Sequence, residues 1–247
     1  DNVARSMLSL LAALREEFSI APVNKNAFPD AGYYCLRHQG MKILMDAGEI
    51  APDYMPGHGH CDGLSFELSV DQHPVFVNSG TGQYQGSLRG YFRSTRAHNT
   101  VVIEGEEQSE CWGEHRVARR ISQVSGDCGA DWIHGELVTA TGRHQKRMIL
   151  AEGQKVVVKD QVTGSAQAYL HLAPGYEYEE QDGQVLVKAV DGNVICRIIP
   201  ELSDQIKIHR DGEICSYAPE FGQIMNIQVL EIAWEGDGSE HEIQINW

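Results

Sequence analysis

The chain has 247 residues, 42% of them hydrophobic, and its 20 basic and 35 acidic side chains give a formal net charge of −15. This acidic balance argues against a general affinity for nucleic acids or anionic membranes. No apolar run reaches the roughly 18 residues that a membrane-spanning helix needs. The length suits either one large β domain or one domain with a smaller attachment, and such a chain can bury a core without disulfides.

The N-terminal segment differs in hydrophobic period from the rest of the chain. Residues 2–18 carry apolar side chains at helical spacing, and Pro22 follows. The sequence therefore predicts one amphipathic helix, which forms with its linker a first segment at residues 1–25. We expect it to be either the tail of a preceding helical domain or a simple cover for a β domain at residues 26–247.

From residue 29 onward the period is two. Leu64–Val70 alternates apolar and polar residues, and residues 32–38 and 41–47 suit a hairpin around Gln39-Gly40. Further strands are expected at 75–78, 99–104, 116–125, 130–140, 144–151, 154–162, 166–172, 184–190, 193–199, 206–210, 213–218, 224–234 and 240–247, with Asp-Gly turns among them. This pattern predicts an all-β fold, a large two-sheet antiparallel β-sandwich, with a smaller sub-layer from about residue 175.

The six cysteines are scattered and include no C-x-x-C pair. Such spacing matches neither a zinc ribbon nor a dense disulfide framework. Free buried thiols are the expected state, and the sequence leaves open whether one disulfide forms.

Two histidines at i and i+2 stand out at residues 57–62, which read GHGHCD. On a β-strand, His58, His60 and Asp62 would share one face, and His98 on a later strand could complete a metal or catalytic group. Asp62 would then orient an imidazole from behind. In a chain with 11 histidines, coincidence is the competing explanation. A cupin site fits poorly, because the next glutamate, Glu67, lies seven residues past His60 and on the other face.

Longer strings around these histidines carry a family resemblance. They read GHGHCDGLSF at 57–66, VFVNSGT at 75–81, RSTRAHNTV at 93–101 and YAPEFG at 217–222, with FPDAGYY upstream at 28–34. In order and spacing they resemble heparinase II/III-type polysaccharide lyases over roughly residues 28–225. The resemblance implies a helical toroid packed against this β-sandwich, with a cleft between them. It also implies cleavage of uronic-acid polysaccharides such as glycosaminoglycans by β-elimination.

The resemblance also implies roles for individual residues. His58 resembles the catalytic histidine, and Tyr84 lies in the loop where some relatives carry a working tyrosine. His60 and His98 resemble two ligands of a structural zinc ion. The third ligand in the family is often an aspartate at the position of Asn78, whose amide brings no charge, so zinc is an open expectation.

Three arginines near this region, Arg89, Arg93 and Arg96, offer planar donors for the carboxylate or sulfate groups of an acidic polysaccharide. A salt-bridged β surface is the competing interpretation. The expected partners are that polysaccharide and a helical toroid domain of the same protein, with a homodimer possible and a periplasmic or secreted location. The alternatives are a non-catalytic carbohydrate-binding module and a protein that modifies envelope polysaccharide.

Overall fold

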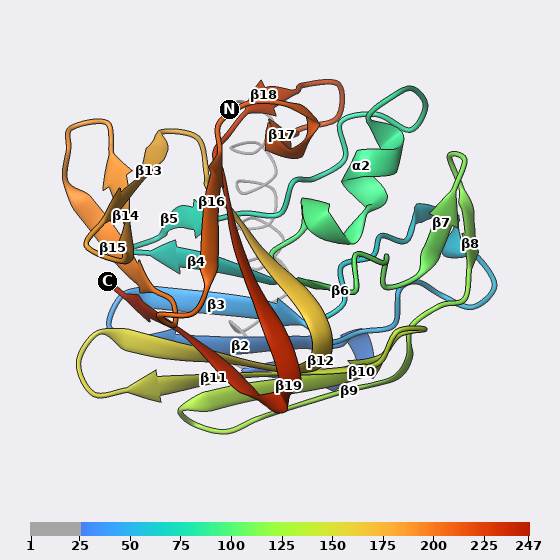
Figure 1. Ribbon diagram of the computed structural model, residues 1–247. Helices are drawn as coiled ribbons and strands as arrows, with labels where there is room; N and C mark the ends of the chain where they lie inside the picture. The colour runs from blue at the N-terminus through green and yellow to red at the C-terminus, as the bar shows by residue number, and fades with distance from the viewer. Residues whose placement is uncertain (1–25) are drawn as a thin grey trace, which may run out of the picture.

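The computed structural model describes residues 26–247, which form two antiparallel sheets with a set of short helical turns and hairpins at one end (Figure 1). The predicted all-β sandwich is confirmed. The helix predicted at residues 2–18 lies outside the described residues, so that prediction stands as it was. In the described part of the chain, no helix is long and apolar enough to cross a membrane.

The smaller sheet has five strands in sequence order, each paired with the next. Its β2–β3 hairpin turns at Gln39 and Gly40, whose φ angles of 42° and 85° are typical of the tight turns that match strand twist. The strands are β1 (Ala27–Phe28), β2 (Tyr33–His38), β3 (Met41–Asp46), β4 (Phe66–Val70) and β5 (His73–Phe76).

The larger sheet of the described residues has ten strands, with the order β13-β14-β15-β19-β12-β11-β10-β9, while β16 pairs with β19 and β6 with β12. The segment from about residue 175 joins this sheet through β13–β15. The strands are β6 (Val101–Ile103), β9 (Ser122–Cys128), β10 (Trp132–Val138), β11 (Arg143–Ala151), β12 (Lys155–His171), β13 (Tyr176–Gln181), β14 (Gln184–Ala189), β15 (Val194–Ile199), β16 (Gln205–His209) and β19 (Val229–Asn246).

Two strands are longer than the sequence predicted. β12 and β19 each run unbroken through segments that the Gly and Asp-Gly signals suggested were turns. Gly164 and Gly236 pair with each other where the two strands bend together, and a register shift follows at Gln161/Thr163. Glycine here permits a bend inside a paired ladder, because Gly164 adopts a φ of 91°.

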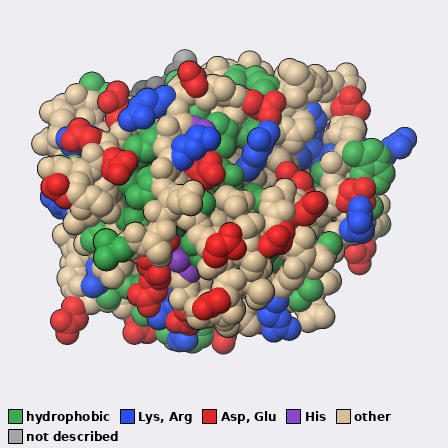
Figure 2. Space-filling model, viewed as in Figure 1, with side chains coloured by type: hydrophobic (Ala, Val, Ile, Leu, Met, Phe, Trp, Pro, Cys, Tyr) green, Lys and Arg blue, Asp and Glu red, His purple; other side chains and the backbone are tan. Residues whose placement is uncertain are grey.

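The core lies between the two sheets, where alternate residues of each strand meet. Ile43 and Leu68 of the small sheet and Ile133 and Ile245 of the large sheet are all buried in this one cluster. A buried polar group of His144, Lys146 and Asp160 shares the inner face of β11 and β12. On the outer surface, acidic and basic side chains are interspersed (Figure 2).

The irregular elements gather beside the sandwich. The helix α2 and the β7–β8 hairpin lie at the same end (Figure 1), and the hairpin contacts both α2 and the turn η2. These elements are η1 (Pro29–Ala31), η2 (Pro56–His58), α2 (Arg89–Arg93), η3 (Thr95–Ala97), β7 (Glu110–Trp112), β8 (Arg116–Ala118), η4 (Glu213–Cys215), β17 (Ser216–Tyr217) and β18 (Met225–Asn226).

Candidate functional site

The histidine-rich segment is a turn followed by irregular backbone, not the β-strand that the i, i+2 argument assumed. Pro56 begins the short turn η2, and β4 starts only at Phe66. Gly59 allows a close approach, since a Cβ there would lie 2.7 Å from the carbonyl oxygen of Ile50. The turn sends His58 and His60 to different environments, which a strand would have placed on one face.

His58 belongs to an exposed aromatic cluster. Its ring lies 5.2 Å from that of Tyr84, edge to face, and 5.6 Å from that of His115, between centroids. Tyr84 also lies 5.0 Å from Phe221. Tyr84 is 43% exposed, and Phe221 is more so. The four side chains come from η2, the loop before α2, the β7–β8 turn and the segment after β17, so tertiary folding alone brings them together.

His60 turns the other way and meets His98, with ring centroids 5.4 Å apart. The ligand atoms of His60, Asp62 and His98 all lie within 4.8 Å of one another. Neither ring nitrogen of His98 has a hydrogen-bond partner in residues 26–247, although the residue is fully buried. A buried polar atom without a partner is costly, and a cation between these groups would remove that cost.

The electrostatics keep both imidazoles neutral. Burial, followed by the charges of Arg89 and Arg93, lowers the pKa of His60 to about 4. Burial, and then His60, lowers the pKa of His98 well below its ordinary value. Burial also raises the pKa of the Asp62 carboxyl to about 7, with Asp46 adding to the effect. Two neutral imidazoles and one carboxyl that ionises near neutral pH make a donor set that suits zinc.

Asn78, the position expected to supply a third ligand, lies at the start of a tight turn. Its side-chain oxygen accepts a hydrogen bond from the Gly80 amide at 2.9 Å. The amide therefore has a structural partner already, whereas the carboxylate that joins the two histidines is that of Asp62.

Two of the three candidate substrate-binding arginines are buried. Arg93 is 1% exposed, and its guanidinium donates to the carbonyl oxygens of Gly59 and Arg116, both at 3.1 Å. It therefore ties the histidine segment to the β7–β8 hairpin, and its donors point into the protein. A substrate-binding role for Arg93 does not fit this placement, which the sequence could not reveal because charge alone suggests exposure.

Arg89 is also buried but borders the cluster. Its Nε donates to the Glu114 carbonyl at 3.1 Å, and its Nη1 lies 3.3 Å from Nε2 of His60. The guanidinium lies over the Tyr84 ring, 5.5 Å from the centroid. Arg89 thus links the exposed cluster to the buried group of His60. Arg96 is exposed, pairs with Glu213 at 2.7 Å and lies over the Tyr91 ring, 6.0 Å from its centroid.

The residues after His98 hold the site together. Asn99 donates to the carbonyl oxygens of Phe66 and Val77, and its own side-chain oxygen accepts from the His171 amide. Thr100 donates to the Gly63 carbonyl at 2.8 Å. Residues 98–100 therefore join β4, the residue after β5 and the end of β12 behind His98. These bonds explain why the HNT string lies beside the candidate ligands.

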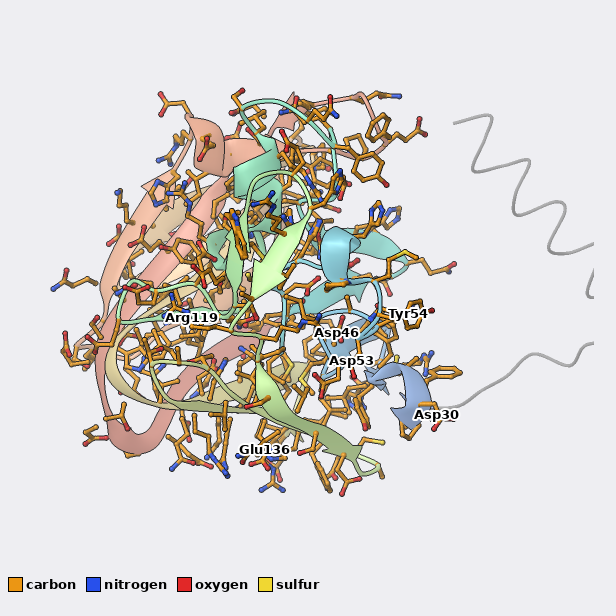
Figure 3. The ribbon with its side chains drawn as sticks, turned by 90° about the vertical axis from the view of Figure 1, so that its right-hand side faces the viewer. Asp30, Asp46, Asp53, Tyr54, Arg119 and Glu136 are labelled. Atoms are coloured by element: carbon orange, nitrogen blue, oxygen red, sulfur yellow. The ribbon has the colours of Figure 1, made fainter. Side chains whose placement is uncertain are left out.

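Sequence reasoning missed His115. It lies in the turn between β7 and β8, and its ring nitrogen Nδ1 is 3.3 Å from the Gly57 carbonyl oxygen. No spacing rule links it to His58, because it arrives on a separate hairpin. In Figure 3 this hairpin faces the viewer, and the labelled Asp53 and Tyr54 mark the segment leading into η2. Phe221 stands in the YAPEFG string, and nothing in that string indicates that its ring reaches Tyr84.

A search of curated sequences found no match. Among solved structures, a heparan sulfate lyase HepC mutant from Pedobacter heparinus is similar, with a TM-score of 0.71, 14% identity, 96% of this chain covered and 41% of that one. A structure named heparinase III-BT4657 gene product has a TM-score of 0.71 and 15% identity, with 98% of this chain and 41% of that chain covered. A structure named heparinase III has a TM-score of 0.66 and 18% identity, with 92% of this chain and 37% of that chain covered.

At these identities the structures show a shared fold, and the chain spans about two fifths of their length. The family model described as "Heparinase II/III-like, C-terminal" matches residues 21–247, nearly the whole chain and all the segments that form the site. This chain belongs to the heparinase II/III-like C-terminal domain family.

Proposed function

We propose that this chain is the β domain of a polysaccharide lyase that cleaves uronic-acid polysaccharide by β-elimination. The observation that carries the proposal is the pairing of the exposed His58 and Tyr84 rings, 5.2 Å apart, at the surface of the family domain. An imidazole and a phenol side by side supply one group that accepts a proton and one that donates it.

The reaction needs both groups. A base removes the proton at C5 of the uronic acid, which is acidic because it lies next to the carboxyl group. The bond between C4 and the glycosidic oxygen then breaks, and an acid protonates that oxygen. His58 and Tyr84 are the pair proposed for these steps. His115 and Phe221 would border the sugar, and Arg89, which lies over the Tyr84 ring, would hold the phenol in place.

A structural zinc ion suits the buried group. His60 and His98 would hold it with Asp62. Asn78, whose side-chain oxygen also accepts from the Gly80 amide, would be a further oxygen ligand. The unpartnered nitrogens of His98 are the observation in favour. Zinc at this depth would fix the segment from His58 to Asp62, and so the position of the His58 ring, without taking part in the chemistry.

The proposed partner is a helical toroid domain of the same protein, which would form the opposite wall of the cleft. Large apolar side chains exposed on or next to the site elements, Tyr54, Met55, Trp112, Phe221 and Ile224, suit such a packing surface. The proposed location is periplasmic or secreted, where the protein would encounter acidic polysaccharides.

The test measures unsaturated uronide, by its ultraviolet absorbance, on heparan, alginate and hyaluronan. We expect no turnover by this chain alone and turnover by the protein that carries it with its helical domain. In that larger protein, His58→Ala should lower kcat at least 100-fold while substrate binding is retained. The control His134→Ala, on β10, should leave kcat unchanged. Robust turnover by this chain alone would refute the two-domain assignment. Binding of the polysaccharide by the larger protein without any product would favour a binding module.

Metal analysis tests the zinc proposal separately. The purified chain should contain one zinc per molecule, and His98→Ala should lose it. Asp62→Ala and Asn78→Ala compare the two oxygen donors, and we expect the larger loss from Asp62→Ala because a carboxylate brings charge. A protein that folds normally and stays free of metal after zinc is supplied would refute the proposed zinc site.

A further inference from the structure

Two cysteines meet at the edge of the candidate site. Sγ of Cys61, the residue after His60, lies 3.6 Å from Sγ of Cys111 on β7. The two residues are 50 positions apart, and all six cysteines are free thiols in this structure. A disulfide has its sulfurs about 2.05 Å apart, so closing this pair requires a movement of roughly 1.5 Å, within reach of side-chain rotation.

The pair also has an accessible member. Cys61 is 1% exposed, and its thiol donates to the Ser109 carbonyl oxygen at 3.2 Å. Cys111 is half-buried and borders the exposed Trp112. An oxidant can therefore reach Cys111 first, with the thiol of Cys61 held behind it as the group that resolves the mixed disulfide.

The bond would join two parts of the site. Cys61 lies in the segment that carries His58 and His60, and Cys111 lies in the hairpin that carries His115. At present, noncovalent contacts hold these parts together, chiefly the Arg93 guanidinium between Gly59 and the end of the hairpin.

We propose that Cys61 and Cys111 form a disulfide that fixes the β7–β8 hairpin against the histidine segment. The oxidant is a small-molecule or protein disulfide, such as oxidised glutathione. The Cys111 thiolate attacks one sulfur of the oxidant and releases one thiol. Cys61 then attacks the mixed disulfide and releases the second thiol. Two protein thiols lose two protons and two electrons, and the oxidant is reduced to two thiols.

The experiment oxidises the reduced full chain with oxidised glutathione, blocks the remaining thiols and counts them after denaturation. We expect four blocked thiols in place of six. After tryptic digestion, one disulfide should link the peptides 43–89 and 97–116, which contain only Cys61 and Cys111 respectively. Six remaining thiols, glutathione held on Cys111 alone, or a bond between another pair of cysteines would overturn the proposal.

The melting temperature tests whether the bond restrains the fold. A loop of about 50 residues closed by a disulfide predicts a rise of roughly 10 °C on oxidation. Cys111→Ser should abolish this rise. Cys128→Ser, which replaces another half-buried strand cysteine, should keep it. A linked pair with an unchanged melting temperature, or a rise that survives in Cys111→Ser, would contradict the proposed restraint.

Discussion

The buried polar group inside the sandwich offers the sharpest test of the fold. Asp160, 1% exposed, lies 2.7 Å from Nε2 of His144 and 2.9 Å from Nζ of Lys146. Lys146 also lies over the ring of Phe66 in the opposite sheet, 5.6 Å from its centroid. The change Asp160→Asn keeps the shape of the side chain but leaves the lysine buried without a countercharge.

Removing one partner of a buried ion pair costs about 3–5 kcal/mol, because the remaining charge has lost its water and its partner. The expected result is therefore a fall of about 3–5 kcal/mol in the free energy of unfolding, measured by urea denaturation. The melting temperature should fall by roughly 10 °C for a domain of this size. Glu240→Gln is the matched control, since it removes an exposed contact to Lys159 at 2.7 Å and should cost less than about 1 kcal/mol.

The same carboxylate predicts the pH dependence. Burial alone would raise the pKa of Asp160, but Lys146 and His144 together lower it below its ordinary value. A carboxyl whose pKa is lower in the folded state stabilises the fold above its unfolded pKa of about 3.9, and this stabilisation is lost as the pH falls below that value. Wild-type unfolding free energy should therefore drop more steeply below about pH 4 than that of Asp160→Asn. A variant within about 1 kcal/mol of wild type at pH 7 would refute the reasoning.

Two further predictions concern the framework of the site. Arg93→Met should lower the free energy of unfolding by about 2–4 kcal/mol, because the carbonyl oxygens of Gly59 and Arg116 lose a charged donor. The control Arg116→Met replaces an exposed side chain and should cost less than about 0.5 kcal/mol. Equal losses for the two variants would contradict the buried placement of Arg93. Gly80→Ala should lower the free energy of unfolding by at least about 2 kcal/mol, because Gly80 has a φ of 77° and an added Cβ would collide with the Ala218 carbonyl. In the control Gly90→Ala in α2, the added Cβ meets nothing within 4 Å, so this change should be neutral or stabilising.

Local patterns predicted the strands best where two signals agreed. The β2–β3 hairpin had both alternation and a Gln39-Gly40 turn, and it was predicted within a residue or two. β12 and β19 were each predicted as two strands, because Gly164 and Asp237-Gly238 suggest turns when read locally. Only the pairing of Gly164 with Gly236 in neighbouring strands shows that these glycines bend a continuous ladder.

The candidate site divides in the same way. The nearness of His60 and His98 came from the family resemblance, since 38 residues separate them and no periodicity connects them. His115 reaches His58 through a hairpin whose packing depends on Arg93, and a charged residue that is buried on backbone carbonyls leaves no mark in the sequence. The nearness of the Asp62 carboxyl to both imidazoles likewise depends on the irregular backbone after η2.

The most direct test of the proposed chemistry is product analysis in water labelled with heavy oxygen. Elimination breaks the glycosidic bond without adding water, whereas hydrolysis places one oxygen of the solvent in the product. Acidic polysaccharide treated briefly with the protein that carries this domain should yield unsaturated uronides that contain no heavy oxygen, provided that they are analysed before the new reducing-end oxygen exchanges with solvent. His58→Ala should yield almost none of these products. Saturated products that carry one heavy oxygen per cleavage would contradict the lyase assignment.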